Sequence, residues 1–262
     1  MTNGKKRRDM RDKIDRITEA IGKSGKSVLF TGAGISTESG IPDYRSKGGI
    51  WEQYRPVYFD EFMQSKRSRI EYWRRKSELY ADLKAARPNP AHLAIAELHR
   101  QGLVHTVVTQ NIDGLHQAAG VPQEEVIELH GNTLRVRCMS CNAISGIEEA
   151  QQRIEGGDPA PECHCGGYLK PDTISFGQAM PATETKRAVA ICSACDFLMV
   201  VGSTLLVQPA SLLPGYAKNS GAFLAIVNLS ETPYDDVCDV RIQGKAGEVL
   251  PEIATRTSEK RG

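Results

Sequence analysis

Short runs of apolar residues recur along the chain, with segments of helical period between them. The runs cover residues 26–30, 105–109, 126–129, 198–201 and 223–227, and each is apolar or β-branched over most of its length. A strand that is apolar on both faces is buried on both faces, which is typical of parallel strands covered by helices. The pattern therefore predicts an α/β fold with a doubly wound parallel sheet.

Segments of helical period complete this picture. Apolar side chains return every three or four positions in residues 9–22 and 91–100. The stretch 51–83 is rich in aromatic residues and Arg, and its second half has helical spacing until the sequence Arg-Pro-Asn-Pro at 87–90 interrupts it. Residues 133–170 are polar and turn-rich and carry cysteines. We interpret this last stretch as a small module inserted into the sheet domain.

Composition narrows the class of protein. A chain of 262 residues suffices for one large core and a small module, and 40% hydrophobic with 25% charged residues is typical of a soluble globular protein. The net charge of +1 gives no electrostatic reason to expect a nucleic-acid partner. No apolar run approaches the roughly 20 residues that span a bilayer. We expect a cytoplasmic monomer without membrane contact, and interpret the basic residues 5–8 as a solvated helix start rather than a targeting signal.

Four of the seven cysteines form two close pairs, Cys138 with Cys141 and Cys163 with Cys165, which are separated by 21 residues. This spacing is typical of a tetrahedral zinc site. His164 is an alternative ligand, although four thiolates are the simpler set. Four protein ligands leave no open coordination position, so the zinc is expected to be structural. The remaining cysteines are interpreted as buried thiols: Cys192, Cys195 and Cys238.

A glycine turn, Gly32-Ala33-Gly34, follows the first apolar run. Glycines allow the backbone to approach a pyrophosphate, and the N-terminus of a following helix would offer free N–H groups to it. The dehydrogenase fingerprint requires a third glycine where this chain has Thr37. The turn therefore permits a dinucleotide site but disfavours a hydride-transfer enzyme, and a tight turn without any ligand remains an alternative.

Polar side chains follow two of the predicted strands. Residues 109–114, Thr-Gln-Asn-Ile-Asp-Gly, come after one strand, and His130 follows another. Ligands of open α/β sheets bind at the carboxyl ends of the strands. A histidine there can serve as a general base near neutral pH, although helix capping by Asn and Asp is the alternative role for such residues. Two such clusters beside a glycine turn favour a functional site.

In combination these pieces resemble the sirtuin family. The matching stretches keep their order from about residue 25 to 252, and they are 32–36, 40–45, 109–113, 130–131, the two cysteine pairs, 170–172, 176–177, 201–203 and 226–228. The resemblance implies one catalytic unit over 1–262. Its Rossmann-like part would comprise 1–45, 88–132 and 172–262, and its small domain the helical insertion 46–87 with the zinc module 133–171.

The resemblance implies an NAD-dependent protein-lysine deacylase, in the first place a deacetylase, that releases nicotinamide, O-acyl-ADP-ribose and free lysine. His130 would be the base that takes a proton from a ribose hydroxyl, with Asn111 and Asp113 as the other catalytic residues. Asn111 would orient a water or a ribose hydroxyl. NAD would be held by Ala33, Gly34, Thr37, Asp43, Tyr44, Arg45, Gln110, Ile112, Gly202, Ser203, Asn228 and Ala246.

The same resemblance implies an acylated protein or peptide as substrate. Phe176 and Gly177 would border the peptide, which would bind by strand addition. Tyr72 and Arg75 have the Tyr-x-x-Arg spacing that binds acidic acyl groups such as succinyl in some sirtuins. Lys47 argues against that preference, because those sirtuins carry a small residue near the corresponding position.

Three other functions share parts of this pattern. An NAD-dependent protein ADP-ribosyltransferase would use the same nucleotide site without removing an acyl group. A non-enzymatic NAD sensor or zinc adaptor would have no need of His130 as a base. A dehydrogenase is disfavoured by the broken glycine spacing at Thr37.

Overall fold

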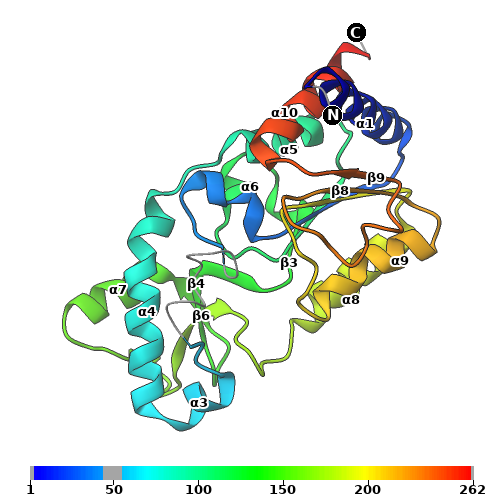
Figure 1. Cartoon of the computed structure of the whole chain (residues 1–262). Helices are drawn as coiled ribbons and strands as arrows, with labels where there is room; N and C mark the ends of the chain where they lie inside the picture. Colours follow the sequence, from blue (N-terminus) through cyan, green and yellow to red (C-terminus); the bar gives the residue numbers. More distant parts are fainter. Residues whose placement is uncertain (1–2, 44–54, 261–262) are drawn as a thin grey trace.

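A six-stranded parallel sheet organises the larger part of the molecule in the computed structural model, which describes residues 3–43 and 55–260 (Figure 1). The strand order is β3-β2-β1-β7-β8-β9, and every neighbouring pair is parallel. The predicted doubly wound sheet is confirmed. The strands are β1 (Ser27–Thr31), β2 (Thr106–Thr109), β3 (Val126–Glu128), β7 (Phe197–Val201), β8 (Phe223–Val227) and β9 (Val240–Ile242).

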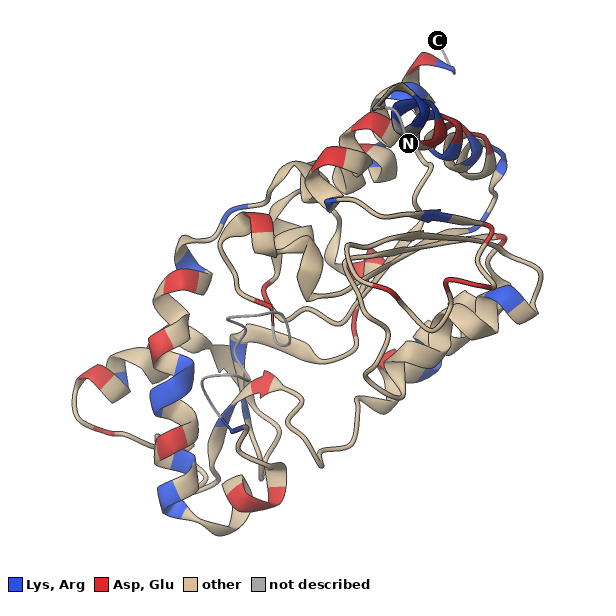
Figure 2. Ribbon diagram, in the orientation of Figure 1, with Lys and Arg blue, Asp and Glu red and all other residues tan. Residues whose placement is uncertain are grey.

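Helices cover both faces of this sheet because successive side chains of a strand point to opposite faces. Leu29 of β1 belongs to a core shared with α1, α5 and α10, whereas Val28 and Phe30 belong to a second core shared with α8 and α9. Their bounds are α1 (Asn3–Lys23), α5 (Pro90–Arg100), α10 (Ala246–Glu259), α8 (Ala182–Ala194) and α9 (Leu213–Asn219). Charged residues gather on outer helices such as α1, while β1, β7 and β8 carry none (Figure 2).

The smaller part is built on an antiparallel sheet of order β5-β4-β6. Trp73 is fully buried between α4 and this sheet, and its Nε1 donates to the carbonyl oxygen of Leu169 at 3.0 Å. The helical insertion and the cysteine-bearing module therefore share one core. The elements are β4 (Gly131–Cys138), β5 (Ile144–Gly146), β6 (Leu169–Thr173), α3 (Phe59–Gln64), α4 (Lys66–Ala85) and α7 (Ile147–Glu155).

The chain enters and leaves the cysteine-bearing module at two paired segments, which we call the two crossings. It leaves the sheet part after β3 and enters β4, and it returns at the end of β6, where Gly131 pairs with Thr173. Gly131 has φ +74°, and a Cβ built on it would lie 1.9 Å from the carbonyl oxygen of Asp172. Only glycine permits this left-handed backbone and this close approach. The crossover places His130 directly beside the returning strand.

Short elements complete the described chain: α6 (Leu115–Ala118) and the 3-10 turns η1 (Ala33–Ile35), η2 (Thr37–Ser39), η3 (Gln123–Glu125) and η4 (Ala210–Leu212). Within the described ranges, every helix is too short or too polar to cross a membrane.

Candidate active site

A cavity of about 730 Å³ lies at the carboxyl ends of β1, β2 and β7. In the strand order, β1 stands between β2 and β7, so the chain reverses its winding direction at this edge. Such a switch point is where open α/β sheets bind their ligands. The sheet part contributes Gly34, Asn111 and Gly202 to the wall, and the small part contributes Tyr72 and Thr173.

Two glycine turns meet at the base of this cavity. The amide of Gly34 donates to the carbonyl oxygen of Gly202 at 2.8 Å, and a Cβ on Gly34 would lie 2.8 Å from that oxygen. Gly202 adopts φ +63°, where a Cβ would lie 2.3 Å from the amide nitrogen of Ile35. The missing side chains allow the two turns to pack directly against each other, which brings the ends of β1 and β7 together at the base of the cavity.

The expectation of a helix with free N–H groups after β1 is wrong. Two 3-10 turns follow, and they use their own amides: Ile35 donates to Gly32 and Ser36 to Ala33, each at 3.1 Å. Gly40, at φ +83°, ends the second turn, and Pro42 follows it. Residues at a left-handed position and next to proline do not continue an α-helix. Any phosphate site here therefore rests on turn geometry and not on an α-helix N-terminus.

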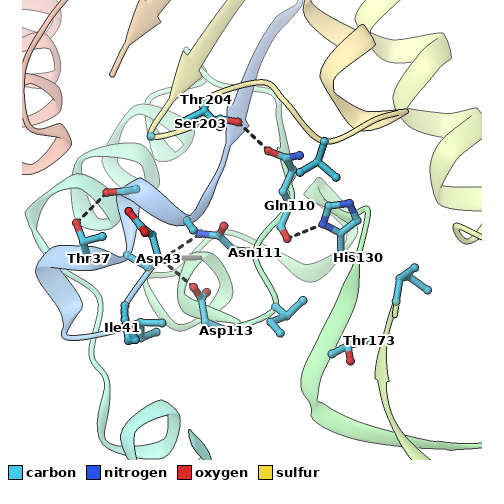
Figure 3. A pocket seen from close by; sticks show the side chains of 18 of the residues that line it. Thr37, Ile41, Asp43, Gln110, Asn111, Asp113, His130, Thr173, Ser203 and Thr204 are labelled. Carbon is cyan, nitrogen blue, oxygen red and sulfur yellow. Dashed lines mark hydrogen bonds between the residues drawn. The ribbon is translucent and has the colours of Figure 1, made fainter. Parts of the chain in front are cut away.

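Ser36 joins the two polar residues of the loop after β2. Its Oγ donates to Oδ2 of Asp113 at 2.7 Å and accepts from Nδ2 of Asn111 at 3.0 Å (Figure 3). Burial raises the pKa of Asp113, an effect opposed by hydrogen bonds from the amide of Leu115 and from Ser36. Asn111 and Asp113 are both buried, and Ser36 fixes their side chains relative to each other.

His130 lies across the cavity from these residues (Figure 3). Its Nδ1 lies 3.0 Å from the carbonyl oxygen of Gln110. Because a carbonyl only accepts, Nδ1 carries the proton and Nε2 keeps its lone pair. Burial lowers the pKa of His130, and the hydrogen bond to Gln110 opposes the shift in part. The ring is therefore neutral at pH 7 and able to accept a proton at Nε2.

Gln110 connects the loops after β2 and β7. Its Oε1 accepts from Oγ of Ser203 at 2.8 Å (Figure 3). Asn228 follows β8 and is buried, with Nδ2 donating to the carbonyl oxygen of Ser230 at 2.9 Å. These residues line the same cavity as Ala246, the first residue of α10. Three strand ends and one helix start thus converge on one elongated wall.

The side of the cavity toward the small part combines aromatic and basic residues. Oη of Tyr72 lies 3.2 Å from Oγ1 of Thr173. Burial alone would raise the pKa of Tyr72, but the positive charges of nearby Lys170 and Lys76 outweigh burial and lower this pKa to about 7. Nε of Arg75 donates to Oε1 of Glu71 at 2.6 Å. Phe176 is 41% exposed, and its ring centroid lies 5.9 Å from that of Tyr58.

The four cysteines of the small part lie together. Their sulfur atoms are all within 4.8 Å of one another, with Cys138 and Cys165 3.5 Å apart and Cys141 and Cys163 3.8 Å apart. A tetrahedral site with Zn–S bonds of about 2.3 Å requires sulfur separations of about 3.8 Å, so this set fits zinc. The predicted zinc ligands are thus brought together. The other thiols lie elsewhere: Cys192 and Cys195 are buried, and Cys238 is partly buried.

Most residues singled out from the sequence line the one cavity. They are Tyr72, Arg75, Phe176, Gly177, Gln110, Asn111, Ile112, Asp113, His130, Ala33, Gly34, Thr37, Asp43, Gly202, Ser203, Asn228 and Ala246. Tyr44, Arg45 and Lys47 lie outside the described residues. No role for Ser36 follows from the sequence, where a serine after a glycine turn looks like an ordinary turn residue. Its bridge between Asn111 and Asp113 becomes visible only when two loops 75 positions apart are placed together.

Comparisons with known proteins point to one family. The family model described as "Sir2 family" matches residues 32–209. The chain is 46% identical over 243 residues to the NAD-dependent protein deacetylase 1 of Bradyrhizobium diazoefficiens, covering 92% of this chain and 95% of the relative. It is 43% identical over 254 residues to the NAD-dependent protein deacylase 2 of Archaeoglobus fulgidus, covering 96% and 99%. A solved structure of Sir2 with a p53 peptide and NAD⁺ superposes with a TM-score of 0.82 at 35% identity, covering 95% and 98%.

Proposed function

The chain belongs to the Sir2 family, and on that premise we propose that it is an NAD-dependent protein-lysine deacylase that transfers the acyl group to ADP-ribose. The observation that carries this function is the neutral His130, fixed by Gln110, in one cavity with Asn111 and Asp113. A protein that only bound NAD would not need a neutral histidine whose Nε2 can accept a proton in this cavity. The relatives named above are themselves deacetylases or deacylases that depend on NAD.

We propose that NAD lies along the wall of the cavity to which Gly34, Gly202, Asn228 and Ala246 contribute. The backbone of the two glycine turns would face the phosphates, and Asn228 and Ala246 would contact the adenosine half. NAD would supply a ribose carbon to which the acyl oxygen of the substrate bonds as nicotinamide leaves. His130 accepts a proton at Nε2 from a ribose hydroxyl, which activates that hydroxyl toward the acyl carbon. Ser36 holds Asn111 and Asp113 in place for the ribose side.

The zinc is structural in this account. Four cysteine ligands occupy a tetrahedral site, and the cluster belongs to the small part and not to the lining of the cavity. The zinc would join the loop after β4 to the loop before β6 and so keep β4 and β6 paired. No step of the reaction involves it.

The substrate is an acyl-lysine segment of a protein or peptide. Phe176 stands exposed at the rim, and the backbone of 174–176 passes the cavity. We propose acetyl-lysine as the first substrate. Acidic acyl groups are a second candidate, favoured by Tyr72, Arg75 and Lys76 on one wall, but Glu71 already pairs with Arg75 and would compete with an incoming carboxylate. Competing acetyl and succinyl peptides in one assay decide the order, and an Arg75→Met variant with an unchanged succinyl rate removes the second candidate.

We further propose that the protein acts as a monomer in a reducing compartment such as the cytoplasm, without a nucleic-acid partner. In the described residues none of the seven cysteines forms a disulfide, and metal-bound or buried thiols are typical of a reducing environment. Residues of both charge signs occur on outer helices such as α1 and α4 (Figure 2). Analytical ultracentrifugation and cell fractionation test the two statements separately.

Product analysis separates deacylation from ADP-ribosyl transfer. The purified chain is incubated with NAD and an acetyl-lysine peptide, and the products are identified by mass spectrometry. Deacylation predicts equal amounts of nicotinamide, O-acetyl-ADP-ribose and deacetylated peptide. A peptide that retains its acetyl group and gains ADP-ribose would instead support the transferase.

A further inference from the structure

Arg135 of β4 contacts carboxylates from both parts of the molecule. Its Nη2 donates to Oε2 of Glu128 at 2.7 Å, and its Nε donates to Oδ2 of Asp172 at 3.3 Å. Glu128 ends β3 in the sheet part, and Asp172 lies in β6 of the small part. The side chains of the two acids are 7% and 14% exposed, so water screens these ion pairs less than it screens surface pairs.

Glu128 holds the chain on both sides of His130. Its Oε1 accepts from Nε2 of Gln117 at 2.8 Å and from Nδ2 of Asn132 at 2.6 Å, while Oε2 accepts from Arg135. Glu128 lies two residues before His130, and it is hydrogen-bonded to Asn132, which lies two residues after His130. This closed loop leaves the backbone of His130 little freedom to move.

Asp172 lies two residues before the segment 174–176, just as Glu128 lies two residues before His130. Two residues after it, the amide of Ile174 donates to the carbonyl oxygen of His130 at 3.0 Å. Residues 174–176 then line the cavity. Arg135 thus binds one acid just before His130 and a second just before the segment that faces it. The guanidinium is a planar fork, so it fixes direction as well as distance between the two acids.

We propose that Arg135 is a positioning residue of the deacylation reaction. Through Glu128 and Asp172 it sets the separation between the imidazole of His130 and the segment 174–176, against which the acyl-lysine lies. This inference rests on the proposed function, because it concerns the same cavity. Arg135 does not touch the cavity itself, since it is absent from the described lining; it acts through the two chain crossings.

Arg137 provides a matched control. It lies two positions further along β4, its side chain is 35% exposed like that of Arg135, and it also pairs with Asp172, at 2.7 Å. In the described part of the chain Arg137 forms an ion pair with Asp172 alone, so Arg137 does not connect the chain before His130 with the chain before Ile174. Substituting Arg137 removes the same charge from the same strand but leaves the contact between Arg135 and Glu128 intact.

The experiment compares Arg135→Met with Arg137→Met in the full chain. Steady-state kinetics give kcat and KM for an acetyl-lysine peptide, calorimetry gives the Kd for NAD, and zinc content and Tm report folding. We expect Arg135→Met to lower kcat/KM for the peptide roughly tenfold to a hundredfold, because small displacements of a reacting group cost that much. The Kd for NAD and the zinc content should change by less than about twofold, and Arg137→Met should alter kcat/KM by about twofold at most.

Equal losses of kcat/KM in Arg135→Met and Arg137→Met would overturn the proposal. A loss of kcat/KM in Arg135→Met that is matched by a loss of zinc or of NAD affinity would overturn it too. Glu128→Gln gives a second measurement if Arg135→Met does not fold, because the amide keeps an acceptor oxygen. It should lower kcat/KM in the same direction with NAD binding unchanged, and wild-type kinetics in Glu128→Gln would contradict the role. A wild-type chain that deacetylates nothing contradicts the proposed function instead, so the two failures are distinguishable.

Discussion

Oγ of Ser36 lies 2.7 Å from Oδ2 of Asp113 and donates a hydrogen bond to it. The serine closes the glycine turn after β1, and the aspartate belongs to the loop after β2. The bond therefore locks two strand ends together at the place where the nicotinamide riboside would bind. Because the hydroxyl also accepts from Asn111, one small side chain determines the geometry of two proposed catalytic residues.

Replacing Ser36 with Ala should weaken NAD binding. The change removes hydrogen bonds that orient Asn111 and Asp113 before NAD binds, so ordering these side chains becomes a cost of binding, and KM for NAD should rise roughly threefold to tenfold. Ser39→Ala is the control, since Ser39 lies in the same turn but bonds to Asn89. Equal KM values in the two variants would show that the bridge to Asp113 has no part in binding.

The acid limb of activity should reflect His130. The base must be neutral to accept a proton, and burial lowers the pKa of His130 from its ordinary 6.5. The neutral form therefore persists to lower pH than in a free histidine, and kcat/KM should begin to fall only below about pH 6.5. NMR titration of the ring, with the resonance assigned by its loss in His130→Ala, measures the pKa directly. A midpoint above 6.5 would be inconsistent with the buried, neutral base.

Removal of one zinc ligand should cost both metal and stability. Cys138 is the buried member of the cluster, and its replacement by Ala should abolish stoichiometric zinc binding. Loss of several kcal/mol of metal-linked folding free energy should lower Tm by about 10 °C. Cys238→Ala should keep its zinc, because Cys238 lies outside the cluster. If metal-free Cys138→Ala melts at the wild-type temperature, the zinc is not structural.

The sheet and the cavity could be anticipated from the sequence to different degrees. The apolar run 198–201 identifies β7, because a short run that is apolar on both faces is typical of a strand buried on both sides. By contrast, β9 has three residues, too few to show any period, and β4 lies in a stretch whose cysteines and polar residues conceal its strand character. The cavity residues follow strand ends and glycines, which are local signals. Ser36 bonds to Asp113, 77 positions away, and Arg135 bonds to Asp172, 37 positions away. No local pattern reveals such partners.

A pair of buried histidines should make the fold sensitive to acid. The rings of His92 and His116 lie 5.1 Å apart, and burial lowers their pKa values to about 4 and about 3. In the unfolded chain these two histidines have a pKa near 6.5, so between pH 6.5 and pH 4 the unfolded chain binds more protons than the folded chain. Stability is therefore complete above about pH 6.5 and decreases as the pH falls toward 4.

Urea unfolding at a series of pH values measures this effect. For His92 alone the free energy of unfolding should fall by about 2 kcal/mol over that range. His92→Gln should flatten the dependence. A pH dependence that is identical in His92→Gln and in the wild type would show that the buried ring does not titrate with folding.

The role of His130 as the base is best tested by the yield of O-acetyl-ADP-ribose in wild type and in His130→Ala, measured by mass spectrometry with NAD and an acetyl-lysine peptide. We expect stoichiometric product from the wild type and a loss of at least about a hundredfold in the variant, with zinc content and Tm unchanged. Undiminished product from His130→Ala would contradict that role.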